Sequence, residues 1–591
     1  MLEFYSDNER LDLPDDIEVD LTFENPFLSQ DRIPLTHSMP FNLPATVTNM
    51  RKFKHPKRLT SIGSWEAISG FFRFNGITFS QGSLMLTEVK KYLSTSFVGI
   101  LVNNLMKKKL SELISVTDFF YSFGIGSRFT PNFTSGWGLL YKNTIFNNLI
   151  DIGNKFAACP VRVKDEEWGY DLSGFGNYNA DKLYLNMWNV NSGNFLFTGG
   201  ATAIHGVIYP QPYIHYLFSQ VFGSALNNNF FSTDAELKTL AMVTSYHKLY
   251  SYNIMSTYRG VLLDNTYFYT DDNYMYLTSF MNKFAFNEFL KDILKIFCCS
   301  LLPRPDGKID IVHNQAIIDS TDVVDWTDKL VGTPNISIEK GKVYAYGYQS
   351  ESLGDEEEHY QVLNNIDVLI QGTTGAGTYQ IANTGEIFEK ILVTEPDEYT
   401  YERKATNLGG NAANSDEDTE SFNISAAIKP IPMRVDEYWW ANNPVTRYPW
   451  YIPEFPGDRK KNDYAPYIGF MRGFYDVVNK VTEAEPVAYT NRYPFMTPYN
   501  RDMAGNEIGN YSLAWEGQDG LIAKFHSGFK DYVEKDKHIL KNEFRLTELD
   551  LKNINYERKY HVAGMNFYIK KVECTLRKKS ISLCKVELKE A

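Results

Sequence analysis

Residues 286–312, FNEFLKDILKIFCCSLLPRPDGKIDIV, constrain the fold more than any other stretch of this 591-residue chain. Their apolar side chains recur at the spacing of one helix face, at Phe286, Phe289, Leu290, Ile293, Leu294 and Phe297. Pro303 and Pro305 cannot continue a helix, because proline lacks an amide hydrogen and its ring collides with the preceding turn. Asp306-Gly307 favours a tight turn, and KIDIV after it predicts a strand. We therefore expect a core-facing helix, a break and a strand.

Cys298 and Cys299 follow the predicted helix and raise the question of a metal or redox site. Cysteines that share a metal usually stand two to four residues apart, and redox pairs usually follow the C-x-x-C spacing. Adjacent residues of a helix instead point about 100° apart. Two small residues that close a core helix are the favoured interpretation. The chain has five cysteines, an odd number and widely spaced, which predicts no disulfide framework and favours synthesis in a reducing cytoplasm.

The first hundred residues carry the pattern of short strands. Ile17, Val19, Leu21 and Phe23 alternate with polar residues, as in a half-buried strand. Asn75-Gly76 between two β-rich runs predicts a hairpin. Strands joined by turns every 8 to 12 residues are typical of a barrel or sandwich.

Four further predictions concern this region. Gln81-Gly82 predicts a second turn, and residues 96–102 predict another strand, followed by a short helix at 103–114. HSMPFNLPA should place Met39, Phe41 and Leu43 on one face of an edge strand, since prolines flank it.

Residues 120–280 show weak periodicity, with one exception. Pro212 suits the first turn of a helix, and Gly223 could close it. Between them one apolar face is formed by Tyr213, Leu217, Val221 and Phe222.

Further along, VVDWTDKLV and NISIEKGKVYAYGY predict a turn and two strands. Residues 511–533 predict a strand, a glycine turn and an amphipathic helix, and about four strands should complete the chain.

The chain is too long for one core, so several domains are expected. The fold class is α+β and β-dominated, with two tube-like β-barrel domains joined by mixed helical and strand domains. Five ranges are predicted: an N-terminal β-barrel at 1–105, a mixed Asn- and Tyr-rich domain at 106–280, a helix with strands that begin a second barrel region at 281–395, an extended Pro- and aromatic-rich, acidic arm at 396–470, and a helix with a C-terminal β domain at 471–591.

Candidate sites for chemistry are few. GTTGAGT at 372–378 lacks the Lys and Ser/Thr of a phosphate-binding loop, and His205 and His215 stand ten residues apart without nearby carboxylates. Trp439, Trp440, Trp450 and Tyr451 could stack on a sugar, but a core or subunit interface is favoured. A glycosidase carboxylate pair cannot be recognised from sequence. The prediction is a non-enzymatic protein, with no catalytic, cofactor-binding or metal-binding residue and no cofactor.

The net charge and the short hydrophobic runs limit the kinds of partner that the chain can bind. The net charge of −13 argues against phosphate binding as the main activity, because that needs clusters of Lys and Arg. It would suit a surface that DNA passes without sticking, and the acidic loops 354–358 and 415–420 are candidates for a lumen or rim, with an ordinary solvated loop favoured. No signal peptide and no stable membrane insertion are predicted.

Several stretches resemble tail hub proteins of tailed phages, in particular those that infect Bacteroidota. The resemblance is carried by residues 286–312 with VVDWTDKLV and ISIEKGKVYAYGY after them, and by LPDDIEVDLTFENPFL, SMPFNLPATVTNMRKFKHP and ITFSQGSLMLTEV. YPFMTPYNRDMAGNEIGNYSLAWEGQDGLIAKFHSGF and LTELDLKNINYERKYHVAGMNFYIKKVE continue it. Residues 120–240 and 395–465 match least.

The resemblance implies a mechanical role as a tail-tip or baseplate hub in the virion, made in the host bacterial cytoplasm. Such hubs carry two tube-like barrels per chain, here about 1–105, and 335–395 with 540–591. A homotrimer or homohexamer would then form a closed ring around the DNA channel. The ring would join the tail tube to distal tail parts, fibres or a plug, and would take part in genome ejection while DNA passes through its lumen without specific binding.

Three alternatives stay open. The first is a ring or nozzle protein of a short-tailed phage. The second is a tail-associated glycan hydrolase that uses carboxylates and the aromatic residues at 439–451. The third is an outer-surface glycan-binding protein, which the missing signal peptide disfavours.

Overall fold

The computed structural model describes somewhat more than half of the chain. The described residues are 1–7, 9–29, 33, 37–57, 67–99, 109–110, 155–163, 183–186, 188–189, 194–195, 211–244, 283–304, 306–349, 377–380, 387–392, 399–405, 420–439, 447–455, 465–476, 492–502 and 506–591. Strands dominate these ranges, and the longest α-helix within them has 11 residues. The prediction of a β-dominated fold is confirmed.

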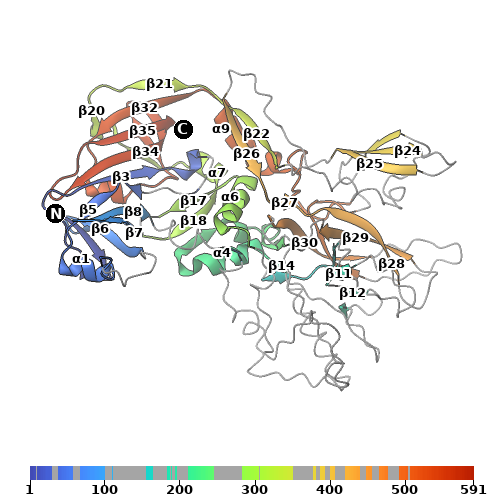
Figure 1. Ribbon diagram of the computed structural model, residues 1–591. Helices are drawn as coiled ribbons and strands as arrows, with labels where there is room; N and C mark the ends of the chain where they lie inside the picture. Colours follow the sequence, from blue (N-terminus) through green and yellow to red (C-terminus); the bar gives the residue numbers. More distant parts are fainter. Residues whose placement is uncertain are drawn as a thin grey trace, which may run out of the picture.

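One curled sheet of 15 strands contains both ends of the chain (Figure 1). Its main path runs through β2 (Glu9–Arg10), β1 (Leu2–Ser6), β6 (Ile68–Phe74), β7 (Ile77–Val89), β8 (Leu93–Gly99), β4 (His37–Ser38), β3 (Glu18–Glu24), β34 (Met565–Arg577), β35 (Cys584–Glu590), β32 (Lys537–Phe544) and β20 (Leu330–Val331). Four strands branch from it: β5 (Phe41–Leu43), β19 (Val323–Asp325), β21 (Ile336–Glu339) and β33 (Lys559–Val562).

The N-terminal and C-terminal β regions meet directly at β3 and β34. These strands are antiparallel and pair over seven residues, from Glu18 opposite Arg577 to Glu24 opposite Lys571. The two regions therefore share one sheet, and two separate tube-like barrels are not confirmed in the described residues. The predicted boundaries between the five ranges stay predictions.

The alternation of the first strands buries the expected side chains. Val19, Leu21 and Phe23 of β3 are buried, and Ile17 just before it is buried too. Asn75 and Gly76 have φ of 48° and 86° and join β6 to β7, so the predicted hairpin is confirmed.

The predicted turn at Gln81-Gly82 is wrong, because β7 runs unbroken through both residues. Gly82 lies opposite Gly70 of β6. A Cβ on Gly70 would come within 2.1 Å of the main-chain oxygen of Tyr5, so that glycine serves the close approach of β1. The predicted strand at 96–102 begins earlier, at Leu93, and the described part ends at Gly99.

The HSMPFNLPA segment is an edge strand only in part. Phe41 and Leu43 of β5 are buried and β5 pairs with β8 alone among the described strands, as predicted. Met39 is 65% exposed, and it lies between β4, which ends at Ser38, and β5, which begins at Phe41.

The helix predicted at residues 286–297 is α6 (Phe286–Ile296), and all six residues of its predicted face are buried. It ends just before the two cysteines, and Pro303 lies in the strand that follows. Cys298 has a φ of 49°, a left-handed turn that reverses the chain into β17 (Cys299–Pro303). The Asp306-Gly307 turn, where Gly307 has a φ of 80°, leads into β18 (Ile309–His313) as predicted.

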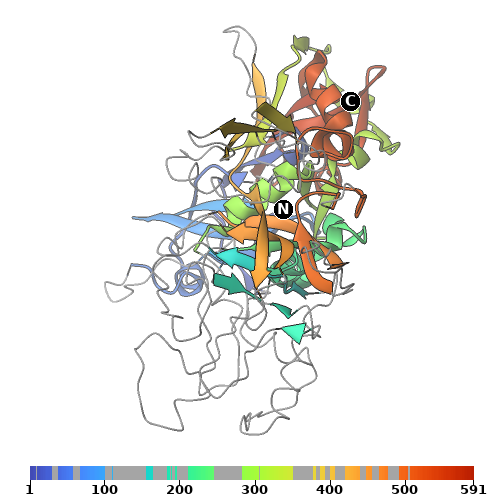
Figure 2. The same cartoon turned by 90° about the vertical axis from the view of Figure 1, so that its right-hand side faces the viewer.

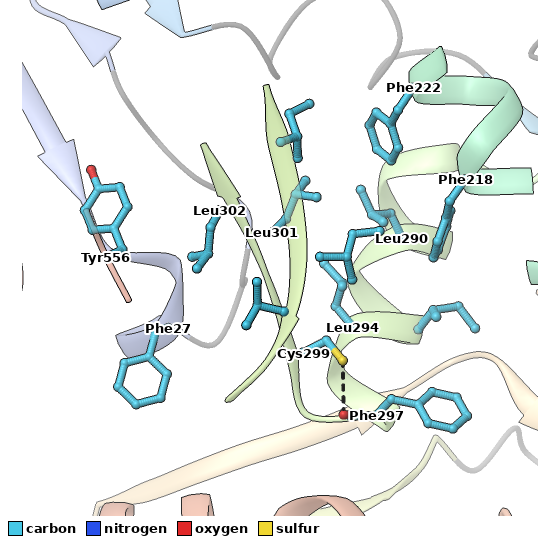
Figure 3. Packing of buried hydrophobic residues seen from close by; sticks show 14 of the residues in the cluster. Phe27, Phe218, Phe222, Leu290, Leu294, Phe297, Cys299, Leu301, Leu302 and Tyr556 are labelled. Atoms are coloured by element: carbon cyan, nitrogen blue, oxygen red, sulfur yellow. Dashed lines mark hydrogen bonds between the residues drawn. The ribbon is translucent and has the colours of Figure 1, made fainter. Parts of the chain in front are cut away.

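The hairpin β17–β18 packs between two groups of apolar side chains (Figure 3). Leu290 and Leu294 of α6 lie on one side, with Phe218 of α4 behind them. Leu302 lies on the side of Phe27. Figures 1 and 2 both place α6 near the middle of the described elements, so this helix forms the centre of the core.

The second predicted helix is α4 (Ile214–Phe222), closed by Gly223 at a φ of 52°. Pro212 does not start it; it lies in β14 (Gln211–Pro212) and pairs with Phe156. A short 3-10 turn (Gly223–Ala225) follows this helix directly. The other 3-10 turns of the described residues lie next to strands, at Pro26–Leu28, Phe230–Ser232, Leu237–Thr239 and Thr327–Lys329.

Smaller sheets contain the other strands of the described residues. Two of them have four strands: one is formed by β10 (Val161–Val163), β11 (Leu183–Leu185), β28 (Met433–Trp439) and β29 (Arg447–Phe455), and the other by β16 (Leu240–Val243), β27 (Lys429–Pro430), β30 (Tyr467–Asp476) and β31 (Arg492–Thr497). Two have three strands: β15 (Leu226–Asn229) with β17 and β18, and β23 (Gly377–Gln380) with β24 (Ile387–Leu392) and β25 (Tyr399–Ala405). Three are strand pairs: β9 (Phe156–Ala157) with β14, β12 (Trp188–Asn189) with β13 (Asn194–Phe195), and β22 (Val343–Tyr348) with β26 (Ser421–Ala426).

The last region contains the helix and four strands that the sequence predicts. The helix is a π-helical turn (Ile522–His526) continued by α9 (Ser527–Glu534), and the strands are β32 to β35. The strand predicted near Leu513 is wrong, since that segment forms bends. Three short helices complete the described set: α1 (Val47–Lys52), α7 (Asn314–Ile318) and α10 (Glu548–Lys552).

Candidate assembly surface

Strand β21 forms an edge of the 15-stranded sheet. Among the described strands it pairs only with β32, from Ile336 opposite Leu540 to Glu339 opposite Lys537. Figure 1 shows β21 outside β32, at the upper margin of the sheet. An edge strand offers a row of main-chain donors and acceptors on which another chain can add a strand.

The apolar face of the sheet continues onto this edge. The register places Ile569, Leu588, Leu540 and Ile336 in one row across β34, β35, β32 and β21. The first three are fully buried, whereas Ile336 is 46% exposed. The row therefore reaches the margin of the sheet and ends there with its last side chain only half covered.

Ile338 extends the exposed apolar surface along the same strand. It stands two residues after Ile336 and so points to the same face, and it is 62% exposed. Natural edge strands usually carry charges, prolines or bulges that discourage pairing. Two exposed isoleucines on one face of β21 are instead typical of a contact surface.

Hydrogen bonds hold both ends of β21 in place. Before the strand, the main-chain NH of Asn335 donates to Asn542 Oδ1 at 2.7 Å, and Asn542 Nδ2 donates to the oxygen of Thr333 at 2.9 Å. After it, the NH of Gly341 donates to Asp536 Oδ1 at 2.9 Å. The edge is thus formed before any partner arrives, which lowers the entropy that binding must overcome.

The other face of β21 carries a charge cluster. The Glu339 carboxylate lies 3.2 Å from Lys589 Nζ and 4.0 Å from Lys570 Nζ. Burial acts to raise the pKa of Glu339, but the neighbouring lysines outweigh it and hold that pKa below its usual range. The two faces differ: one is ion-paired to the sheet and the other is apolar and open.

The cysteines singled out in the sequence lie in the core. Cys298 and Cys299 are buried and form no disulfide. Cys298 Sγ accepts from Asn314 Nδ2 at 3.5 Å, and Cys299 Sγ donates to the oxygen of Phe297 at 3.3 Å (Figure 3). These contacts fit the predicted packing role.

Three of the four aromatic candidates, Trp439, Trp450 and Tyr451, lie on the paired strands β28 and β29. The β28–β29 register places Trp439 opposite Arg447, Trp450 opposite Asp436 and Tyr451 opposite Val435. The two tryptophans are therefore not cross-strand partners. Trp440 lies outside the described residues.

The remaining candidates have no common site. His215 lies on α4, and His205 falls outside the described residues. So do loop 354–358, all of 415–420 except Glu420, and all of 372–378 except the start of β23; the helix at 103–114 is described only at residues 109–110. Within the described ranges, no group of three or more His, Cys, Asp or Glu could hold a metal ion. Nor does any helix there combine the length and apolar character that a membrane span requires.

No family model matches the sequence, and no curated protein matches it. Among solved structures, the fold is similar to the 43 kDa tail protein of prophage MuSo2 from Shewanella oneidensis, with a TM-score of 0.28 and 6% identity, over 99% of this chain and 97% of that one. It is also similar to a tail protein from Neisseria meningitidis MC58, with a TM-score of 0.27 and 9% identity, over 100% of this chain and 96% of that one. Both structural neighbours are described as tail proteins.

Proposed function

We propose that the chain is a structural component of a phage tail, a hub or tail-tip protein whose copies form a closed ring around the DNA channel. The ring connects the tail tube to distal attachment parts and takes part in genome ejection. The protein has no enzymatic role in this proposal, and DNA passes through the lumen without specific binding.

The observation that carries the proposal is the apolar edge strand β21. It lies on the sheet that joins the first and last strands of the chain, it is fixed at both ends, and it exposes Ile336 and Ile338. In a head-to-tail ring each copy presents such an edge to a different surface of the next copy. The sequence resemblance to phage tail hubs supports the same role.

Charges on the neighbouring strands support passage of DNA without binding. Lys570 and Lys541 both lie near the carboxylate of Glu587, at 2.8 and 3.4 Å, and Lys571 lies 2.6 Å from Glu573. Lysines that are matched to carboxylates release few counterions on contact with phosphate, so they contribute little to DNA affinity.

The test is the native mass of the purified full chain, with negative-stain images of the same sample. We expect a ring with three- or six-fold symmetry and a central opening. The double variant Ile336→Lys/Ile338→Lys should shift the mass toward single chains, because two charges would be desolvated at each contact.

Val47→Lys is the matched control, since Val47 is 83% exposed but lies on α1 outside the edge strand. It should leave the ring intact. A wild-type protein that remains a compact monomer would contradict the proposal, and that monomer should then be tested for cleavage of cell-wall glycans. A double variant that still forms the wild-type ring would exclude β21 as the contact.

A further inference from the structure

Two cysteines face each other across the last hairpin of the chain. β34 and β35 are antiparallel, with Val572 opposite Val586 and Glu573 opposite Lys585. One more step in this register brings Cys574 of β34 opposite Cys584, the first residue of β35. Both side chains are buried, and neither forms a disulfide.

This arrangement fits the geometry of a disulfide. Directly opposed residues of antiparallel strands have Cα atoms about 4.5 to 5.5 Å apart, and disulfides join Cα atoms about 4.4 to 6.8 Å apart. The Cys584 thiol is also the largest cause of the raised pKa of Cys574, ahead of burial, and Cys584 Sγ donates to the oxygen of Ser582 at 3.7 Å. Cys298 and Cys299 differ, because their thiols contact Asn314 and Phe297 instead.

We propose that Cys574 and Cys584 are a redox-sensitive pair that closes to a cross-strand disulfide when the chain meets a low-molecular-weight disulfide. The thiolate of Cys584 attacks one sulfur of that oxidant and releases one small thiol, which leaves a mixed disulfide on Cys584. The Cys574 sulfur then attacks the Cys584 sulfur, the Cys574–Cys584 bond forms, and a second small thiol leaves with the proton. Two protein thiols are oxidised and one small disulfide is reduced.

The order of attack follows from the position of the two residues. Each cysteine also has a partner on its outer neighbour, Leu21 of β3 for Cys574 and Phe544 of β32 for Cys584. Cys584 directly adjoins the hairpin loop 578–583, where Leu583 is 41% exposed, whereas Cys574 lies three residues before the end of β34. Opening of the loop therefore reaches Cys584 first. Burial in the closed hairpin keeps the reaction slow, since the thiolate is the reactive form.

The bond would add a covalent tie between β34 and β35 close to the turn that joins them. β34 joins the N-terminal strands through β3 and the C-terminal strands through β35. Beyond Cys574 the two arms stay paired through the bridge between Leu576 and Ile581, and the main-chain NH of Thr575 donates to Ser582 Oγ at 2.9 Å. A chain made with reduced thiols would gain this covalent tie on transfer to an oxidising medium, whether or not the chain belongs to a phage tail.

The experiment uses the purified full chain, reduced and then incubated with oxidised glutathione, denatured in acid and alkylated. The reduced chain should take up five alkyl groups and the oxidised chain three, because the sequence has five cysteines. Trypsin should then release Val572–Arg577 linked to Ser580–Lys585, lighter than the two free peptides by two hydrogens. The unfolding midpoint should rise by a few degrees in the oxidised form and return on reduction.

Two variants sharpen the result. Cys584→Ser should lose the linked peptide and the change in midpoint, and Cys298→Ala/Cys299→Ala should keep both. Five alkylated thiols after prolonged oxidation of the wild type would overturn the proposal. So would a disulfide confined to the tryptic peptide that contains Cys298 and Cys299. The wild-type peptide map decides the matter even where a variant fails to fold.

Discussion

Asn25 donates a hydrogen bond from its side-chain amide to the main-chain oxygen of Ile569, at 2.9 Å and across 544 positions of sequence. Its main-chain NH donates to the oxygen of Lys570 at 3.2 Å. The register of β34 against β35 shifts between Ile569 and Lys571, so Lys570 is the extra residue of a bulge. Asn25 thus satisfies two carbonyl oxygens at the irregularity and ties the end of β3 to it.

Replacing Asn25 by Ala should lower the free energy of unfolding by about 1–3 kcal/mol, because buried carbonyl and amide groups would lose their partners. The side chain also accepts from the NH of Phe27 at 3.0 Å. Urea titration followed by fluorescence measures the change. Asn42→Ala, at an exposed position of β5, is the control and should change the value little. Equal losses in both variants would contradict this role of Asn25.

A second buried connection joins Arg472 of β30 to Glu236. The guanidinium pairs with the Glu236 carboxylate and donates from Nη2 to the oxygens of Tyr499 and Tyr511, at 3.0 and 2.7 Å. Glu236 also accepts from the NH of Asn510 at 2.7 Å. Burial lowers the pKa of Arg472, although the Glu236 carboxylate acts in the opposite direction. The pair holds Tyr499, Asn510 and Tyr511 against the segment before β16.

The variant Glu236→Ala should lose about 3–5 kcal/mol of stability, since it leaves the Arg472 charge buried without its partner. The double variant Glu236→Ala/Arg472→Met should recover part of the loss, because no unpaired charge remains. Thermal unfolding of the two single variants and the double variant gives the coupling energy. Additive losses would show that the two charges do not depend on one another.

Local patterns predicted local elements well. The helix face from Phe286 to Phe297, the alternation in β3 and the Asn75-Gly76 hairpin depend on neighbours in sequence, and the structure contains them. The Gln81-Gly82 turn failed for a different reason. Its glycine lies opposite Gly70, where β1 approaches closely, and that contact involves strands far apart in the chain.

The candidate surface could be predicted only in part. The sequence NISIE predicted the strand that became β21. It did not predict that this strand would lie at the edge of the sheet, with β32 as its only partner among the described strands. Exposure of Ile336 and Ile338 follows from the order of strands in the sheet. The Cys574–Cys584 pair is equally a matter of register, because ten residues separate the two cysteines in sequence.

Gly341 should be the residue most sensitive to substitution near the edge strand. A Cβ there would lie 1.9 Å from the main-chain oxygen of Glu534. Because this oxygen belongs to the main chain, it cannot move aside as easily as a side chain could. Gly341→Ala should cost about 1–3 kcal/mol, the range for overpacking, and should weaken ring formation with it. Ser337→Ala on the exposed part of β21 is the control. Thermal unfolding and native mass of both variants measure the effects, and an unchanged Gly341→Ala protein would contradict the predicted contact.

Asp292 on α6 connects the central helix to the segment after β26. Its carboxylate accepts from the main-chain NH of Ala427 at 2.6 Å and of Ile428 at 3.0 Å. Burial raises the pKa of Asp292 and outweighs these two hydrogen bonds, which act to lower it. The folded chain therefore holds this proton more tightly than the unfolded chain does.

A carboxyl group with a raised folded-state pKa contributes stability that is complete below the unfolded pKa and is lost as the pH rises through the folded pKa. Asp292→Asn removes this dependence, because the amide does not titrate. The free energy of unfolding of the variant should therefore rise relative to wild type as the pH increases above the unfolded-state pKa of an aspartate, about 4. Urea titrations of both proteins from about pH 4 upward measure the difference, with Asp531→Asn at an exposed position of α9 as the control. A difference that stays flat or falls with pH would show that burial does not dominate the titration of Asp292.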